Sequence, residues 1–256
     1  ILSENLSRWQ DEGLVPDMAI EQGDETTRLL RERGWTHWHH LFSPRDLLKL
    51  ALLRKHISDP ELAPELCGTL DFCSKLSRWI VRFSSGGGSD FTSNVFSNQA
   101  LNTLYNWANR SFFDHSFVQS YKNTPIHVNA SVVCSPSREI TKEQDIFITD
   151  PPYADAVAYE EITEFFIAWL RKNPPKPFDG WVWDSRRALA VKGSGDDFRH
   201  GMVAAYKAMA EHMPGNGMQC VMFTHQDTAV WGDLIGIFWA AGLQVVAAWY
   251  IATETT

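Results

Sequence analysis

The sequence predicts an α/β protein with a mostly parallel, incomplete β-sheet and a mainly helical part before it. Short runs rich in β-branched and aromatic residues predict four strands, and helical apolar periods separate the last three of them. Strands that alternate with helices favour a parallel sheet, so the arrangement is Rossmann-like, with its first strands missing or replaced. We expect residues 1–114 to be mainly helical and residues 115–256 to form the α/β region. The predicted strands are residues 126–133, 145–149, 218–224 and 243–252.

Two amphipathic helices are expected in the first region. Ser43 and Asp46 form a capping-box pattern around Pro44, which takes the first helical position. The pattern predicts a helix from residue 44 to about residue 57. A second apolar stripe predicts a helix over residues 97–109.

The helices of the α/β region have clear boundaries. A helix over residues 196–213 ends at the Pro-Gly-rich turn 214–217, and a helix over residues 231–241 ends at Gly242. An earlier helix carries one apolar face, formed by Ile162, Phe165, Phe166, Trp169 and Leu170.

Composition favours a soluble cytoplasmic protein. The 256 residues are 44% hydrophobic, enough to bury a substantial core. The sequence has no apolar run of about 18 residues and no signal-peptide pattern, so we expect no membrane association. The cysteines lack the spacing of zinc or disulfide motifs, and we expect reduced core thiols and no metal site. They are Cys67, Cys73, Cys134 and Cys220.

The formal charge of -8 argues against a protein that wraps a long duplex, because phosphate neutralisation dominates such binding. Local basic groups can still serve nucleic-acid binding. The early basic segment is read as a solvated helix face. A second group either borders a nucleic-acid entrance or is another solvated face. Its members are Arg186, Arg187, Lys192 and Arg199.

Asp150, Pro151, Pro152 and Tyr153 form the most informative motif, because they directly follow the predicted strand 145–149. Ligands of open α/β sheets bind outside the carboxyl ends of the strands. The Asp150 carboxylate and the Pro151 carbonyl can each accept a proton of an exocyclic amino group, which restores its nucleophilic lone pair. The prolines stiffen the turn, and Tyr153 offers a ring for an extruded base. The motif predicts chemistry on a nucleobase, with a plain β-turn as the alternative.

Two further residues are candidates for substrate binding. His225 follows the predicted strand 218–224 and would share the sheet edge with Asp150, although a structural histidine is the alternative. Tyr159 follows the motif and can line a base pocket, with a core aromatic as the alternative.

The motif resembles the catalytic motif of amino-group DNA methyltransferases, and its Asp-first, Tyr-last form is similar to the adenine-specific type. A wider stretch resembles the large adenine-specific DNA methyltransferases that carry a zinc ribbon and a further accessory region elsewhere in their chains. Single matching residues include His225, Trp231, Gly242 and Trp249. The matching blocks are residues 38–48, 96–107, 150–171 and 221–254.

The resemblance implies S-adenosylmethionine as cofactor and a class I methyltransferase-like fold. In such enzymes a segment like residues 38–48 contacts the methionine end of the cofactor, so Phe42 and Pro44 are cofactor-binding candidates beside Asp150. Simple helix capping is the alternative for Pro44. The sequence departs from the family in one respect, because it has no glycine-rich F-x-G-x-G loop after a first strand. Its one glycine run, residues 86–88, is flanked by serines and reads as a flexible loop.

The family's glycine loop lies far towards the amino end of a longer chain, so we expect this chain to be a central fragment. Its implied partners are DNA, the remainder of its own longer chain and other subunits of a defence system. The leading hypothesis is methylation of the exocyclic amino group of adenine in DNA. The alternatives are a non-catalytic methyltransferase-like module that binds DNA or partner subunits, and an RNA methylase.

Overall fold

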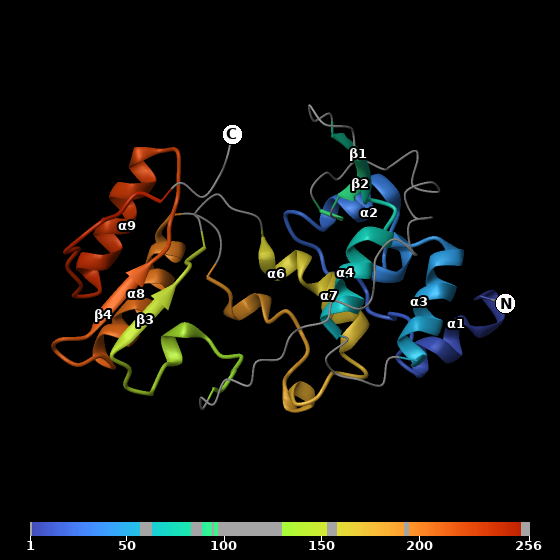
Figure 1. The fold of residues 1–256 in the computed structure, drawn as a ribbon, viewed down its shortest axis with the longest axis horizontal. Helices are drawn as coiled ribbons and strands as arrows, with labels where there is room; N and C mark the ends of the chain where they lie inside the picture. Colours follow the sequence, from blue (N-terminus) through green and yellow to red (C-terminus); the bar gives the residue numbers. More distant parts are fainter. Residues whose placement is uncertain are drawn as a thin grey trace. The chain divides into compact units, whose positions relative to one another are not determined.

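The chain forms two compact units, described from a computed structural model. Unit 1 comprises Ile1–Asn129 and Ala158–Ser185, and unit 2 comprises Ala130–Val157 and Arg186–Thr256. The described part is mixed and mostly helical, with a small two-stranded parallel sheet (Figure 1). The boundary predicted at residue 114 lies outside the described residues. These are residues 2–56, 63–82, 89–93, 95–96, 130–152, 158–191 and 195–251.

Unit 1 consists of helices and an antiparallel β-hairpin. Its elements are α1 (Leu2–Asp11), α2 (Thr27–Arg33), η1 (Trp38–Leu41), α3 (Pro44–His56), α4 (Ala63–Cys73), β1 (Arg78–Arg82), β2 (Ser89–Ser93), α6 (Tyr159–Ile162), α7 (Glu164–Leu170) and η5 (Phe178–Gly180). The predicted start of α3 is confirmed. The Ser43 hydroxyl accepts the backbone N–H of Asp46 at 3.2 Å, which satisfies a donor that the first turn of a helix leaves free. The predicted helix 97–109 lies outside the described residues.

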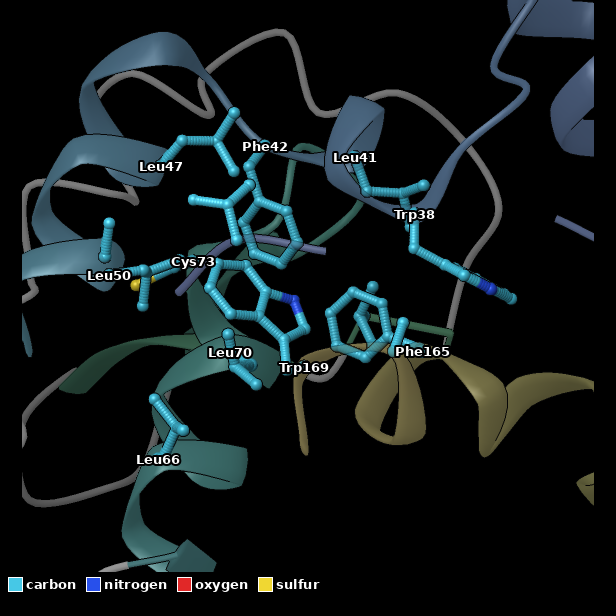
Figure 2. Close-up of a cluster of buried hydrophobic side chains, with 14 of the residues drawn as sticks. Trp38, Leu41, Phe42, Leu47, Leu50, Leu66, Leu70, Cys73, Phe165 and Trp169 are labelled. Atoms are coloured by element: carbon cyan, nitrogen blue, oxygen red, sulfur yellow. The ribbon is translucent and has the colours of Figure 1, made fainter. Parts of the chain in front are cut away.

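Aromatic rings dominate the core of unit 1. The Phe42 ring stacks on Phe165 with centroids 5.5 Å apart and meets Trp169 edge-on at 5.3 Å. Figure 2 shows these rings between α7 and the leucines of α3 and α4. Trp38 also packs edge-on against Phe165. The apolar face of α7, expected from its spacing, is thus the face that closes this core.

The helix after the motif is divided in two, where the sequence predicted one apolar stripe. The break falls at Thr163, whose hydroxyl donates to the carbonyl oxygen of Tyr159 at 2.7 Å. Such a bond to the preceding turn competes with the backbone and bends helices. Phe165 and Trp169 of the stripe are buried, whereas Ile162 is only half-buried.

Unit 2 pairs two parallel strands and packs two helices against them. Ile146 pairs with Met218, and Thr149 pairs with Val221. The predicted strands 145–149 and 218–224 are confirmed in shortened form. The predicted helices 196–213 and 231–241 are confirmed with shifted ends. The elements are η4 (Ser137–Glu139), β3 (Ile146–Thr149), η6 (Arg187–Leu189), α8 (Asp196–Glu211), β4 (Met218–Val221) and α9 (Thr228–Ala240).

The two faces of this sheet differ. Phe147 and Val221 pack against the buried side chains of α8 and α9. Ile146, Ile148 and Met218, which alternate with them, are exposed. Parallel sheets normally have helices on both faces. Among the described residues, helices cover only one face of this pair of strands.

Two of the predicted strands do not form as expected. Residues 243–251 contain no strand, so that prediction is wrong there, and Trp249 and Tyr250 are almost fully exposed. Residues 130–133 form no strand either, and residues 126–129 lie outside the described part. These runs have the composition of buried strands, but a strand also needs a neighbour with which to share its backbone hydrogen bonds, and no described segment pairs with them.

The cysteines divide into two kinds. Cys73 is buried and Cys67 half-buried, and burial raises the pKa of the Cys67 thiol to about 11 and that of Cys73 to about 12. Cys134 and Cys220 are exposed, so the prediction of core thiols is wrong for them. Cys220 alternates on β4 with residues that face the helices, which places it on the uncovered face of the sheet.

None of the helices in the described ranges combines the length and the apolar character that crossing a bilayer requires.

Candidate functional site

The motif residues lie where β3 and β4 end. Beyond the paired strands, Met222 still donates its backbone N–H to the carbonyl oxygen of Thr149 at 2.8 Å, so the sheet holds the chain up to the residue before Asp150. Asp150 is exposed, Pro151 is buried and Pro152 is half-buried. The buried Pro151 anchors the turn, and the acidic side chain is accessible to solvent at the carboxyl edge. Tyr153 lies outside the described residues.

A pocket opens beside this turn, entirely within unit 2. Apolar side chains from α8 and α9 form most of its wall, and Pro152 brings the motif to its rim. Gly195 begins α8 with φ +82°, a conformation that glycine adopts without strain. The residues that line the pocket are Pro152, Gly195, Phe198, Arg199, Met202, Phe223, Val230, Asp233, Leu234 and Ile237. An apolar pocket with a few polar groups is the usual form of a small-molecule site.

The polar groups of the pocket are an ion pair. Arg199 of α8 donates to Asp233 of α9 at 2.7 Å, and the Asp233 carboxylate raises the pKa of Arg199. Both side chains are about half exposed. The pair therefore joins the two helices at the solvent side of the pocket and remains accessible to a charged or hydrogen-bonding ligand.

The other members of the second basic group differ from Arg199. Arg186 is half-buried, and its guanidinium donates to the carbonyl oxygen of Cys134 at 3.5 Å. Arg187 is buried, and Lys192 lies outside the described residues. Arg187 is withdrawn from solvent, so it does not support the interpretation that this group borders a nucleic-acid entrance.

His225 follows β4 and makes two local hydrogen bonds. Its Nδ1 accepts the backbone N–H of Asp227 at 2.9 Å, and its carbonyl oxygen accepts the indole N–H of Trp231 at 3.0 Å. A ring nitrogen that accepts a hydrogen bond carries no proton, so a neutral His225 bears its proton on Nε2. The residues around it lead into α9, where the Asp227 carboxylate caps the helix by accepting the N–H of Ala229 at 2.8 Å. His225 does not line the pocket.

The remaining candidates belong to unit 1. Phe42 is almost fully buried in the aromatic core, whereas Pro44 is exposed at the first position of α3. Tyr159 is 57% exposed, so the alternative of a core aromatic is wrong for it. Asp150, Pro151, Pro152 and His225 are the predicted site residues that lie together in unit 2.

The three residues predicted to bind S-adenosylmethionine are divided between the two units, with Phe42 and Pro44 in unit 1 and Asp150 in unit 2. Phe42 is 2% exposed and packs against Phe165 and Trp169, so its ring offers almost no surface to a cofactor. The glycine run 86–88 lies outside the described residues. Of the three residues predicted to bind the cofactor, Asp150 is the one that lies at the sheet edge where the pocket opens.

Three histidines gather in η1 and just before it. The rings of His39 and His40 are 4.4 Å apart, and His37 lies 5.5 Å from each of them. Burial and the neighbouring histidines lower the pKa of His39 to about 4. Among the described residues, no group of three or more His, Cys, Asp or Glu side chains has the arrangement of a metal site.

Sequence reasoning overlooked Tyr206, Phe223 and Asp233. Tyr206 continues the buried stripe of α8 four residues after Met202, so the helical spacing was a signal for its burial. Its hydroxyl lies 3.2 Å from the hydroxyl of Thr149, directly before the motif. Asp233 carried no such signal, because its role depends on where α9 packs against α8.

Comparison with protein-family models, with curated proteins and with solved structures gives no match to this chain. The chemistry of the exposed Asp150 turn and of the adjacent pocket is therefore the basis for inferring a function.

Proposed function

We propose that unit 2 carries the base-binding corner of an enzyme that methylates the exocyclic amino group of adenine in DNA. The observation that carries the proposal is the Asp150-Pro151-Pro152 turn, which follows a parallel strand and borders a pocket through Pro152. In this proposal β3 and β4 are adjacent strands of a Rossmann-like, class I methyltransferase-like sheet, and the motif takes the ligand-binding position at their carboxyl ends.

Asp150 and Pro151 would act on the amino nitrogen. The lone pair of an exocyclic amino group is delocalised into the ring, which makes the nitrogen a weak nucleophile. A carboxylate oxygen of Asp150 and the carbonyl oxygen of Pro151 would each accept one N–H of the adenine amino group. Two acceptors held on a stiff turn favour a pyramidal nitrogen with its lone pair available for methyl transfer. The nitrogen would then lose one proton to the Asp150 carboxylate, and the sulfur of the methyl donor would keep the electron pair of the broken S–CH3 bond.

The pocket suits a flat, mostly apolar ring. Phe198, Met202 and Phe223 contribute apolar wall, and an extruded base needs such surfaces to replace the stacking that it loses. The Arg199–Asp233 pair adds a donor and an acceptor at the same place. S-adenosylmethionine, which the resemblance implies as methyl donor, would be bound by Asp150 together with residues outside the described ranges.

The test is a methylation assay on DNA made by polymerase chain reaction, which contains no N6-methyladenine and offers many short recognition sequences. The chain is incubated with this DNA and S-adenosylmethionine, and the DNA is digested to nucleosides for mass spectrometry. We expect N6-methyladenine, and we expect Asp150→Ala to lower its yield at least about 100-fold. The matched control is Asp145→Ala, because Asp145 is an exposed carboxylate that precedes the other end of β3.

The outcomes separate the candidate functions. N6-methyladenine that persists in Asp150→Ala would overturn the assigned role of Asp150. Methylation of an RNA transcript of the same sequence, without methylation of the DNA, would replace DNA by RNA as substrate. A wild-type chain that modifies neither would overturn the proposal of an enzyme.

One observation favours a non-catalytic binding module as the second candidate. Ile146, Ile148, Met218 and Met222 are all more than half exposed on the uncovered side of the sheet. Exposed apolar patches of this kind are typical of surfaces that bind other protein segments. A chain that is inactive in the assay but is retained by DNA or by a protein partner would support this candidate.

A further inference from the structure

Thr149, the residue before the acidic turn, is held from two different elements. Its carbonyl oxygen accepts the backbone N–H of Met222, which follows β4, at 2.8 Å. Its hydroxyl lies within hydrogen-bonding distance, 3.2 Å, of the hydroxyl of Tyr206 in α8. The first contact fixes the backbone of Thr149, and the second fixes its side chain. The position from which Asp150 projects is therefore set by α8 as well as by the sheet.

The Tyr206 hydroxyl is not needed for packing. The ring is almost fully buried and meets Phe238 edge-on at 5.0 Å, contacts that a phenylalanine could make equally well. A buried hydroxyl loses its hydrogen bonds to water, and this cost is offset only where a partner is provided. The partner here is the side chain that immediately precedes the proposed acceptor.

The Asp150 carboxylate affects the Tyr206 hydroxyl electrostatically. Burial raises the pKa of Tyr206, and the Asp150 carboxylate raises it further, against the opposite effect of the hydrogen bond with Thr149. The phenol therefore keeps its proton at neutral pH, so it can act as the donor and Thr149 as the acceptor.

We infer that Tyr206 is a positioning residue for the acidic turn, because its hydroxyl holds Thr149 and so fixes where the Asp150 carboxylate stands. This inference rests on the proposed function. Small displacements of a group that must meet its substrate at hydrogen-bonding distance reduce turnover strongly. Loss of the hydroxyl should therefore affect the rate of methyl transfer more than the binding of DNA.

The test compares Tyr206→Phe, Thr149→Val and the double variant, with Tyr250→Phe as the matched control because Tyr250 is 94% exposed. We expect each single variant to lower kcat about tenfold. The KM for DNA should stay within about twofold of that of the wild type. The double variant should be no slower than either single one, because both remove the same bond. Thr149→Ser, which keeps a hydroxyl, should retain most of the wild-type rate.

A second measurement does not require activity. Amide hydrogen exchange at Met222, whose N–H donates to the Thr149 carbonyl oxygen, should speed up in Tyr206→Phe and in Thr149→Val, but not in Tyr250→Phe, while circular dichroism shows an intact fold. An active wild type whose Tyr206→Phe variant keeps its full kcat would overturn the inference and leave the proposed function standing. An inactive wild type would overturn the proposed function, and unchanged exchange at Met222 would overturn the inference independently.

Discussion

The carboxylate of Glu161 in α6 accepts the backbone N–H of Thr26 at 3.0 Å and its hydroxyl proton at 3.1 Å, across 135 residues of sequence. It also accepts the N–H groups of Asp24 at 2.8 Å and of Glu25 at 3.0 Å. These donors directly precede α2, where a helix leaves N–H groups without internal partners. Glu161 thus satisfies the turn before α2 and ties the two segments of unit 1 together.

Replacing Glu161 by Ala should lower the free energy of unfolding by about 3 kcal/mol, because three N–H groups, of which that of Thr26 is buried, would lose a charged acceptor. Urea unfolding followed by circular dichroism measures this change.

The neighbour Glu160 provides the control, since Glu160→Ala should stay within about 0.5 kcal/mol of the wild type.

Gly23→Ala tests the same contact from the other side. A Cβ on Gly23 would lie 2.2 Å from the carboxyl carbon of Glu161, so this variant should also be destabilised. Equal stability of Glu161→Ala and Glu160→Ala would contradict the assigned role of Glu161.

Stability should depend on pH through His39. Burial, followed by the charges of His40 and His37, lowers the pKa of His39 from 6.5 to about 4. A histidine with a lowered pKa in the folded state stabilises the fold fully above its unfolded pKa. This contribution is lost as the pH falls from about 6.5 through about 4. Between pH 6.5 and pH 4 the free energy of unfolding should therefore fall less in His39→Asn than in the wild type. The difference should be on the order of 1 kcal/mol after allowance for solvent screening.

Urea unfolding at several pH values tests this expectation, with His56→Asn as the control because His56 is exposed at the end of α3. Some pH dependence should remain in His39→Asn, since burial also lowers the pKa of His40. Protonation of the Glu161 carboxylate at lower pH would lower the free energy of unfolding further. Burial alone would raise its pKa, but the hydrogen bonds from Thr26, Glu25 and Asp24 hold it below 4.5. Identical pH curves for the wild type and His39→Asn would refute the prediction.

A substitution of Phe42 distinguishes a role in core packing from a role in cofactor binding. Replacing it by Ala should lower the free energy of unfolding by about 3–5 kcal/mol, the cost of removing a large ring from a packed core. Pro44→Ala should cost less than about 1 kcal/mol, because Pro44 is exposed at the start of α3. Denaturant unfolding compares the two. A small loss in Phe42→Ala would mean that the ring is accessible, as a cofactor ligand would be.

The sequence was sufficient for elements whose signals are local. Ser43 and Asp46 correctly predicted the start of α3, because a capping box involves residues only three positions apart. The apolar stripes of α8 and α9 likewise depend on neighbours within two helical turns. At the candidate site, Asp150 and Pro152 could be placed at a sheet edge from the strand that precedes them.

The parts that were not predicted depend on distant partners. The bond between Glu161 and Thr26 could not be read from either segment alone. Residues 243–251 have strand-like composition, but a strand forms only where another edge accepts its hydrogen bonds. Phe42 was a cofactor candidate because of the resemblance around it, and its burial depends on Phe165, far along the chain. Local pattern therefore identifies candidate elements, and tertiary packing decides which side chains remain accessible.

Neighbouring residues of β3 test the uncovered face of the sheet. Phe147 packs towards α8 and α9, whereas Ile148 is 69% exposed on the opposite face. Phe147→Ala should therefore lower the free energy of unfolding by about 3 kcal/mol, and Ile148→Thr should change it by less than about 0.5 kcal/mol. Denaturant unfolding and sedimentation should be measured together. If Ile148→Thr is as destabilising as Phe147→Ala, another segment covers this face in solution. If Ile148→Thr instead leaves stability unchanged and reduces self-association, the face is exposed to solvent and promotes association, as its apolar side chains imply.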